Sequence, residues 1–174
     1  GTKIFINRGS KVILKTGIRN IQLDNTTIVV EGNLVANGTT DKRISIRGDR
    51  FDWAYTNISY SYLPSQWGGI YFFSETGNNH LKNTTITGGN IGVLLYGSST
   101  IPVKLDLDGS IVHCMGAYGI LSQFGDLSVV NSEVSNCGKS AILQLGGSLK
   151  MIHSTIANYM PSVFAAVSYT HLRA

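Results

Sequence analysis

Two carboxylates, Asp106 and Asp108, are the residues of this 174-residue chain best spaced for acid–base chemistry. They alternate with leucines in the run Leu105-Asp106-Leu107-Asp108, so in a strand both carboxylates lie on the same face. Such a pair can act as general acid and base on a polysaccharide, or can bind Ca²⁺. If the chain is an enzyme, we predict that Asp106 and Asp108 are catalytic.

A structural interpretation of the same carboxylates competes with the catalytic one. Asp108 matches a polar position that returns along the chain as Asn83, Asn131 and His153. Short polar side chains at such positions commonly bond the local backbone in turns. We favour this interpretation and predict neither a catalytic residue, a metal site nor a cofactor.

Aromatic residues gather in one segment that interrupts the pattern of the chain. Residues 51–73 hold nine of the sixteen aromatics. We expect Trp67 and Phe72 to pack in the core, and we predict that ligands bind to Trp53, Tyr55, Tyr60 and Tyr62. Aromatic faces stack on sugar rings, and long insertions in regular folds are often functional. The alternative is that this loop folds over the protein and buries its own aromatics.

The elements that position these residues follow from a repeat. It reads Asn83-Thr84-Thr85-Ile86, Asp108-Gly109-Ser110-Ile111, Asn131-Ser132-Glu133-Val134 and His153-Ser154-Thr155-Ile156. We call this four-residue motif the first marker. A second marker recurs in phase with it: Gly69-Ile70, Gly92-Val93, Gly119-Ile120 and Ala141-Ile142. The last positions of the first marker recur with a period of about 22–25 residues, and a fixed period of this length indicates a solenoid.

Between the markers, apolar and polar residues alternate, as in Leu127-Ser128-Val129 and Leu149-Lys150-Met151. One such repeat cannot bury its apolar face alone, whereas stacked repeats bury a continuous core. We predict an all-β fold, a right-handed parallel β-helix that is a single-stranded solenoid with coils of about 22–25 residues.

The two cysteines, Cys114 and Cys137, are separated by the same interval as Ile111 and Val134, so we expect them in the same position of neighbouring coils. Stacked free thiols would act as small apolar core residues. A disulfide is the alternative, although directly stacked positions fit its geometry poorly. Two isolated cysteines are no metal site.

Several motifs resemble one known family. Arg47-Gly48-Asp49-Arg50, Gln66-Trp67-Gly68-Gly69-Ile70-Tyr71-Phe72 and the Asn-Ser-x-Val coils resemble right-handed parallel β-helix repeat surface lipoproteins of Gram-negative gut-type bacteria, which are similar in fold to the pectin-lyase-like superfamily. The resemblance covers residues 1–162 and implies an extracytoplasmic setting, at the outer membrane or cell surface or in the periplasm. It implies little about activity. The chain lacks the Asn-Thr-Asp and Gly-His-Gly motifs of polygalacturonases and the Arg-x-Pro-x-x-Arg motif of pectate lyases.

The sequence predicts one β-helix domain over residues 1–162, with an aromatic insertion at about 49–67. We expect a signal and a cap before residue 1, because a strand pattern begins at once and solenoid ends need caps. Residues 163–174 form a tail without the repeat, and residues 167–174 resemble translated adapter sequence, which favours a non-native origin.

Three functions follow from these observations. The first is a non-catalytic, extracytoplasmic β-helix protein that binds a polysaccharide or cell-surface glycan through the insertion and one flat face. The second is a polysaccharide lyase, hydrolase or epimerase, and the third is a structural spacer or adhesin stalk. Basic residues are scattered rather than clustered, so we expect no nucleic acid partner. No segment reaches 18 apolar residues, so membrane attachment would need a lipid anchor outside these residues.

Overall fold

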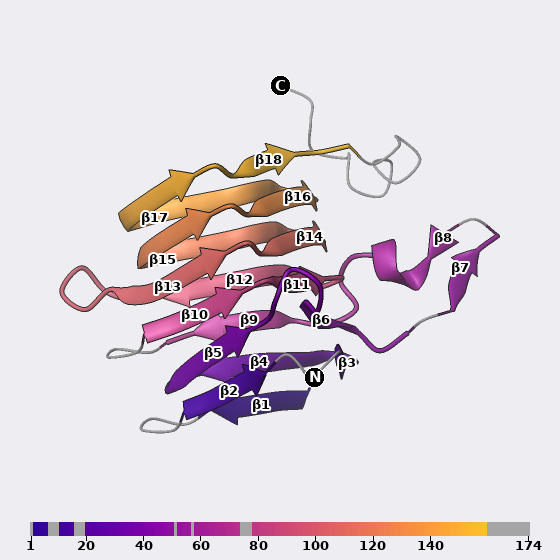
Figure 1. The fold of residues 1–174 in the computed structure, drawn as a ribbon, viewed down its shortest axis with the longest axis horizontal. Helices are drawn as coiled ribbons and strands as arrows, with labels where there is room; N and C mark the ends of the chain where they lie inside the picture. The colour runs from indigo at the N-terminus through magenta and orange to yellow at the C-terminus, as the bar shows by residue number, and fades with distance from the viewer. Residues whose placement is uncertain are drawn as a thin grey trace.

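The computed structural model describes residues 2–6, 11–15, 20–50, 52–56, 58–73 and 78–159. These residues are mostly strand, and their parallel sheets stack as a β-solenoid of about six turns. The chain is therefore a parallel β-helix, as the repeat predicts (Figure 1). The tail at 163–174 lies outside the described residues.

Each coil contributes strand to three faces, which we name A, B and C in chain order. Face A contains β1 (Thr2–Ile6), β4 (Thr26–Val30), β9 (Gly69–Phe72), β12 (Ile91–Tyr96) and the first halves of β15 (Tyr118–Val130) and β17 (Ser140–Ile152). Face B contains β2 (Lys11–Lys15), β5 (Asn33–Asn37), β10 (Asn78–Lys82), β13 (Val103–Asp108) and the second halves of β15 and β17. Face C contains β3 (Asn20–Leu23), β6 (Ile44–Gly48), β11 (Thr84–Thr87), β14 (Ile111–Met115), β16 (Glu133–Cys137) and β18 (Thr155–Ala157).

Inward-facing side chains stack from coil to coil and form the core. On face A the predicted second marker is confirmed, because Ile28, Ile70, Val93, Ile120 and Ile142 lie in one register row. All but the last of these are buried. Burying one such side chain contributes about 1.5–3 kcal/mol, so the rows stabilise the stack far more than any single turn does.

The first marker is wrong by one position in one coil. Val112, rather than Ile111, stacks between Ile86 and Val134 in the core row of face C. Ile111 instead points outward beside the core and is partly exposed. From Ile86 to Val112 this coil is therefore slightly longer than the predicted period of about 22–25 residues.

The same shift moves Asp108 out of the corner position predicted for it. Gly109, at φ 57°, occupies the left-handed corner with the residues Asn83, Asn131 and His153, at φ 44°, 49° and 48°. A Cβ on Gly109 would lie 2.6 Å from the Asn83 side-chain oxygen, so a larger residue here would require the Asn83 side chain to move.

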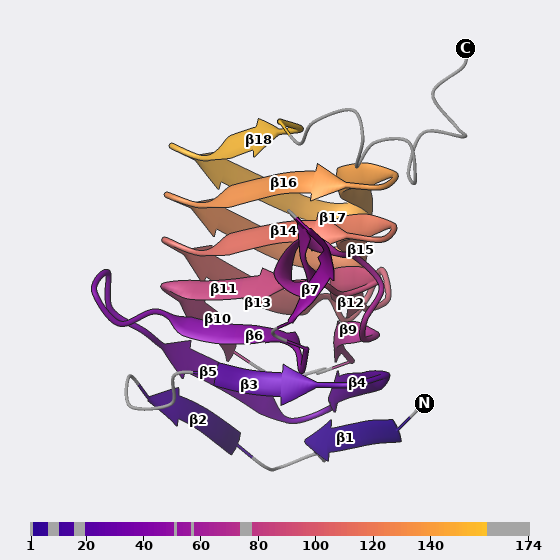
Figure 2. The ribbon, with the colours of Figure 1, turned by 90° about the vertical axis from the view of Figure 1, so that its right-hand side faces the viewer.

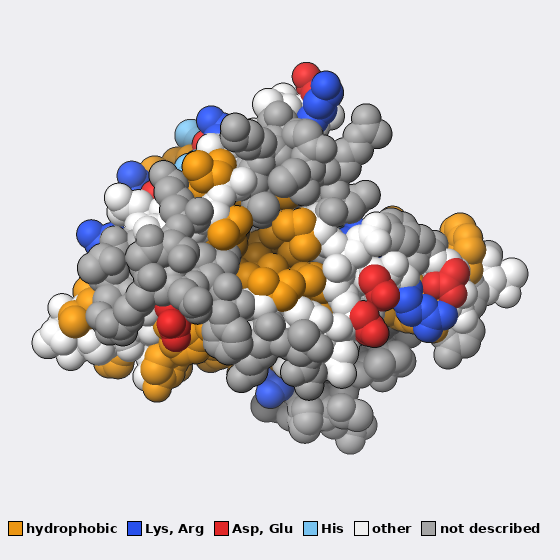
Figure 3. Space-filling model, turned by 90° about the horizontal axis from the view of Figure 1, so that it is seen from below, with side chains coloured by type: hydrophobic (Ala, Val, Ile, Leu, Met, Phe, Trp, Pro, Cys, Tyr) orange, Lys and Arg blue, Asp and Glu red, His pale blue; other side chains and the backbone are white. Residues whose placement is uncertain are grey.

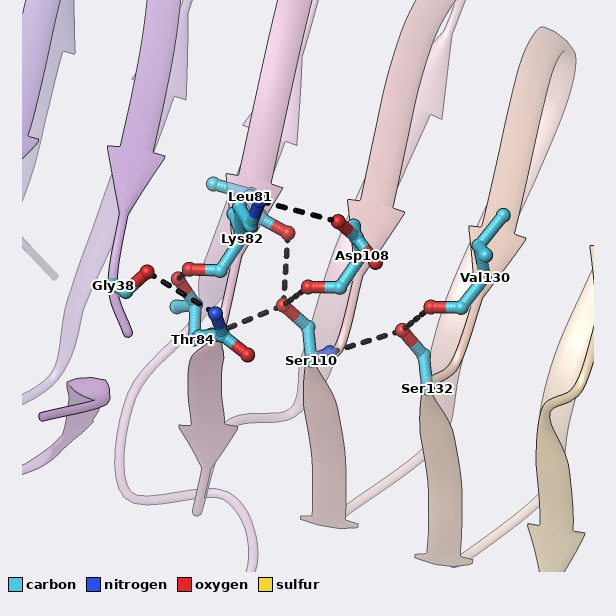
Figure 4. A network of polar contacts seen from close by, with 9 residues as sticks. Gly38, Leu81, Lys82, Thr84, Asp108, Ser110, Val130 and Ser132 are labelled. Atoms are coloured by element: carbon cyan, nitrogen blue, oxygen red, sulfur yellow. Dashed lines mark hydrogen bonds and ion pairs between the residues drawn. The ribbon is translucent and has the colours of Figure 1, made fainter. Parts of the chain in front are cut away.

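A ladder of hydroxyl groups follows this corner between faces B and C (Figure 4). Ser110 Oγ accepts a hydrogen bond from the Thr84 N–H at 3.0 Å and donates one to the Leu81 carbonyl at 2.8 Å. Ser132 Oγ accepts from the Ser110 N–H at 3.0 Å, and Ser154 Oγ accepts from the Ser132 N–H at 3.1 Å. The hydroxyls thereby satisfy corner amides that are buried and tie each coil to the next.

One coil carries a long insertion. The chain is much longer between Ile28 and Ile70, which stack directly, than between the stacked residues Ile70 and Val93 of the next coil. The added residues form the antiparallel pair β7 (Trp53–Tyr55) and β8 (Ile58–Ser59) and the 3-10 helix η1 (Tyr60–Tyr62). They project from the side of the solenoid that carries β6, β11 and β14 (Figures 1 and 2). In the described ranges this short turn is the longest helix, and no helix has the length and hydropathy to cross a membrane.

Candidate functional site

The insertion has a base that is hydrogen-bonded to face C. Arg47 of β6 donates from Nη2 to Ser61 Oγ at 2.6 Å, and Thr87 of β11 donates its hydroxyl to the Ser61 carbonyl at 3.2 Å. The Gln66 side-chain amide donates to the carbonyl of Leu63 at 2.8 Å and to that of Tyr60. Two coils thus hold η1 in place, and the rest of the insertion extends from a fixed point.

Aromatic side chains of the insertion are exposed beyond this base. Trp53 is 65% exposed and Tyr62 is 50% exposed. Tyr60 is partly buried, with the Arg50 guanidinium 3.6 Å from its ring centroid. The backbone of Tyr55 lies in β7, but its side chain lies outside the described part of the structure. Trp67 and Phe72 are buried in the core as predicted, and Trp67 Nε1 donates to the Thr87 carbonyl at 2.8 Å.

A charged pair lies beside these rings. Arg50 Nη2 is 2.7 Å from Asp52 Oδ2, and both groups are exposed. Their hydrogen bond raises the pKa of Arg50 and lowers the pKa of Asp52, so both stay charged over the neutral range. Seen from below, charged side chains gather on the projecting insertion, while hydrophobic side chains fill the middle of the coil (Figure 3). The insertion offers aromatic faces and hydrogen-bonding groups together.

The structure places Asp106 and Asp108 on face B, away from the base of the insertion. Both lie on one face of β13, as predicted, and this face points outward, with Asp106 exposed and aligned between His80 of β10 and Ser128 of β15. Asp108 Oδ2 lies 3.8 Å from Lys82 Nζ, and both groups are well solvated. This contact is a weak surface ion pair.

The cysteines do not occupy one position of neighbouring coils. Cys137 stacks on Met115, so Cys114 corresponds in chain position to Asn136 and lies one position out of the predicted register. Both corner residues have positive φ, 56° for Cys114 and 52° for Asn136. The thiols are free and buried, and burial is the main reason that the pKa of each is raised to about 12.

A polar cluster on face C escaped the sequence-based prediction. His113 Nδ1 lies 3.2 Å from Cys114 Sγ, and Ser135 on the next coil donates to Glu133 Oε1 at 2.6 Å. Tyr159 donates its hydroxyl to the same carboxylate oxygen at 3.0 Å. The only sequence signal was the adjacency of His113 and Cys114, which strand alternation would place on opposite faces.

This cluster does not activate its thiol. Cys114 stays protonated at neutral pH because its pKa is about 12, and only the thiolate is a good nucleophile. Burial lowers the pKa of His113 despite the opposing effect of Glu133, so the imidazole is neutral. Among the described residues, no group of three or more His, Cys, Asp or Glu side chains is arranged to hold a metal ion.

Comparisons with known proteins identify no relative of this chain. No protein-family model matches the chain, and no curated protein or solved structure matches it either. The resemblance to β-helix surface lipoproteins therefore stays a prediction from sequence motifs, and the function has to be argued from the chain's own surface.

Proposed function

We propose that this protein binds a polysaccharide or cell-surface glycan through the insertion, without catalysing a reaction on it. The observation that carries the proposal is the exposure of Trp53 and Tyr62 on a segment whose base is hydrogen-bonded to two coils. A large aromatic left in water forgoes roughly 1.5–3 kcal/mol of burial, which a stacked ligand would recover.

The groups around the rings suit a carbohydrate. Sugar rings present apolar C–H faces to aromatics and hydroxyls to polar side chains. Arg50 and Asp52 stand next to Tyr60 and supply donors and acceptors for such hydroxyls. Because this pair is ion-paired internally, it favours neutral polar ligands over strongly charged ones.

The non-catalytic part of the proposal rests on where the carboxylates lie. Asp106 and Asp108 are on face B, while the aromatic site is anchored on face C, so one glycan segment would not meet both. We place the protein outside the cytoplasm, at the outer membrane or cell surface or in the periplasm, on the strength of the motif resemblance.

A glycan array followed by calorimetry tests the proposal. The double variant Trp53→Ala/Tyr62→Ala should lose roughly tenfold or more in affinity, which corresponds to about 1.4 kcal/mol. Tyr96→Ala is the matched control, because Tyr96 is an aromatic 49% exposed on face A. Equal loss in both variants, or no loss in the double variant, would remove the insertion from the site.

A substrate panel separates binding from catalysis. We expect the wild-type protein to leave neutral and uronate polymers intact. If turnover is seen and Asp106→Asn or Asp108→Asn abolishes it, the protein is an enzyme that acts on face B. If no glycan binds at all, the third function, a spacer or adhesin stalk, replaces the proposal.

A further inference from the structure

The outer surface of face A carries an apolar row that runs from coil to coil. We name this row the face A stripe. Register aligns its members, one from each of β4, β9, β12, β15 and β17: Val29, Tyr71, Leu94, Leu121 and Leu143. Strand alternation points them outward, because the residues before them in the chain form the core row of face A.

The stripe reaches the surface over most of its length. Tyr71, Leu94, Leu121 and Leu143 are partly exposed. Tyr96 flanks the stripe and is 49% exposed, with its ring centroid 5.7 Å from that of Phe73. Contiguous apolar surface of this kind is uncommon on a protein that stays monomeric.

Charge is absent from the same strands. β4, β9, β12 and the first halves of β15 and β17 contain no Asp, Glu, Lys or Arg. Face B of the same coils displays charged groups on β10, β13, β15 and β17: Lys82, Lys104, Asp106, Asp108, Asp126 and Lys150. Faces A and B enclose the same core, so their difference in charge lies only in their outward-facing side chains.

We propose that face A is the surface through which two copies of this chain pair, stripe against stripe, about a two-fold axis. An isologous interface uses the same patch on both copies and so must be complementary to itself, which an uncharged apolar row is. Pairing through face A buries no charged side chain of these strands and leaves the charged groups of face B in water.

The size of the face fits this occupant. Five strand segments about 4.8 Å apart, each of about five residues at about 3.3 Å, give a footprint of roughly 400–500 Å² per copy. Side chains make the accessible surface larger than the flat footprint, so two copies together bury roughly 1,000 Å². This is about the smallest area expected of a specific protein–protein interface. Flat sheets also pack well against each other at about 10 Å.

Other occupants fit the face less well. A membrane surface would call for basic residues around the apolar row, and these strands hold none. A glycan would need side chains that bond its hydroxyls, and the stripe offers only the Tyr71 hydroxyl. Pairing is independent of the proposed glycan binding, since the insertion is anchored on face C.

Sedimentation velocity over a wide range of concentration tests the pairing. We expect the wild-type protein to form a dimer, and Leu121→Lys to weaken dimerisation roughly 100-fold, because the two-fold axis buries each unpaired charge twice. Ser128→Lys is the matched control: it lies in the same strand, β15, but points outward on face B. This control should dimerise like the wild type.

The variant Tyr96→Lys provides a second test of pairing in case Leu121→Lys does not fold. It changes an exposed side chain, so it should keep the β-sheet circular dichroism and melting temperature of the wild type while weakening the dimer. A wild-type protein that is monomeric throughout would overturn the proposal. So would a folded Leu121→Lys variant that dimerises normally, or a monomer whose face A binds phospholipid vesicles or insoluble polysaccharide.

Discussion

The coil stack and the insertion are built on opposite principles. In the stack, each strand of the inner coils is hydrogen-bonded to a strand of the coil before it and of the coil after it, and its inward side chains fill a shared core. The insertion pairs only with itself through β7 and β8 and touches the stack at its base. Changes in the stack should therefore cost stability and spare binding, while changes in the insertion should do the reverse.

The largest effect is expected in the core of the stack. Phe72→Ala removes a fully buried ring and should lower the free energy of unfolding by about 3–5 kcal/mol. Urea denaturation followed by circular dichroism measures this change. Where the variant still folds, its glycan affinity should equal that of the wild type; a selective loss of binding would break the comparison.

The corner ladder comes next. Ser110→Ala leaves the buried Thr84 N–H and the Leu81 carbonyl without this hydroxyl, at a cost of about 1–3 kcal/mol. Hydrogen exchange at the Thr84 amide should accelerate with the loss of stability. Ser128→Ala, at an outward position of β15, is the control and should change little.

The buried thiols predict a loss of stability at alkaline pH. Folding raises the pKa of Cys114 and Cys137 from 9.0 to about 12, so above about pH 9 the unfolded chain loses protons that the folded chain keeps. Stability should then fall by about 1.4 kcal/mol per pH unit for each cysteine until the pH nears 12.

Urea denaturation at about pH 8 and about pH 10 measures this loss, with lysine and tyrosine titration common to all variants. Cys137→Ala should show a shallower decline than the wild type. An identical decline in both proteins would show that the Cys137 thiol is not protected by the fold.

The smallest change in stability is expected at the tip of the insertion. Trp53→Ala should alter the free energy of unfolding by no more than about 0.5 kcal/mol, because its side chain is 65% exposed. Thermal unfolding checks this, and glycan affinity should fall in the same variant. A destabilisation as large as that of Phe72→Ala would mean that the insertion is part of the core.

Much of the fold was predictable because inward positions must be apolar in every coil. The row through Ile70 and Val93 was found for that reason. The corner was misplaced because the sequence shows side-chain polarity, whereas the corner selects for left-handed backbone. Gly109 satisfies that need better than Asp108, although Asp108 looks more like Asn83 and Asn131.

The surface was less predictable than the core. Cys114 takes a left-handed corner, so alternation fails there and its contact with His113 could not be foreseen. The face A stripe was missed because a continuous run such as Val93-Leu94-Leu95 does not reveal which leucine points outward. The insertion was predictable because it interrupts the period of the coils.

The hydroxyl ladder has a direction, and that direction bears on how the coils can assemble. Each corner amide, from Thr84 to Ser110 to Ser132, bonds to a hydroxyl that is synthesised about one coil later. During folding, a coil therefore keeps an unsatisfied corner amide until the following coil docks on it. If coils add in chain order, the coil at the growing end is the one open to errors of pairing.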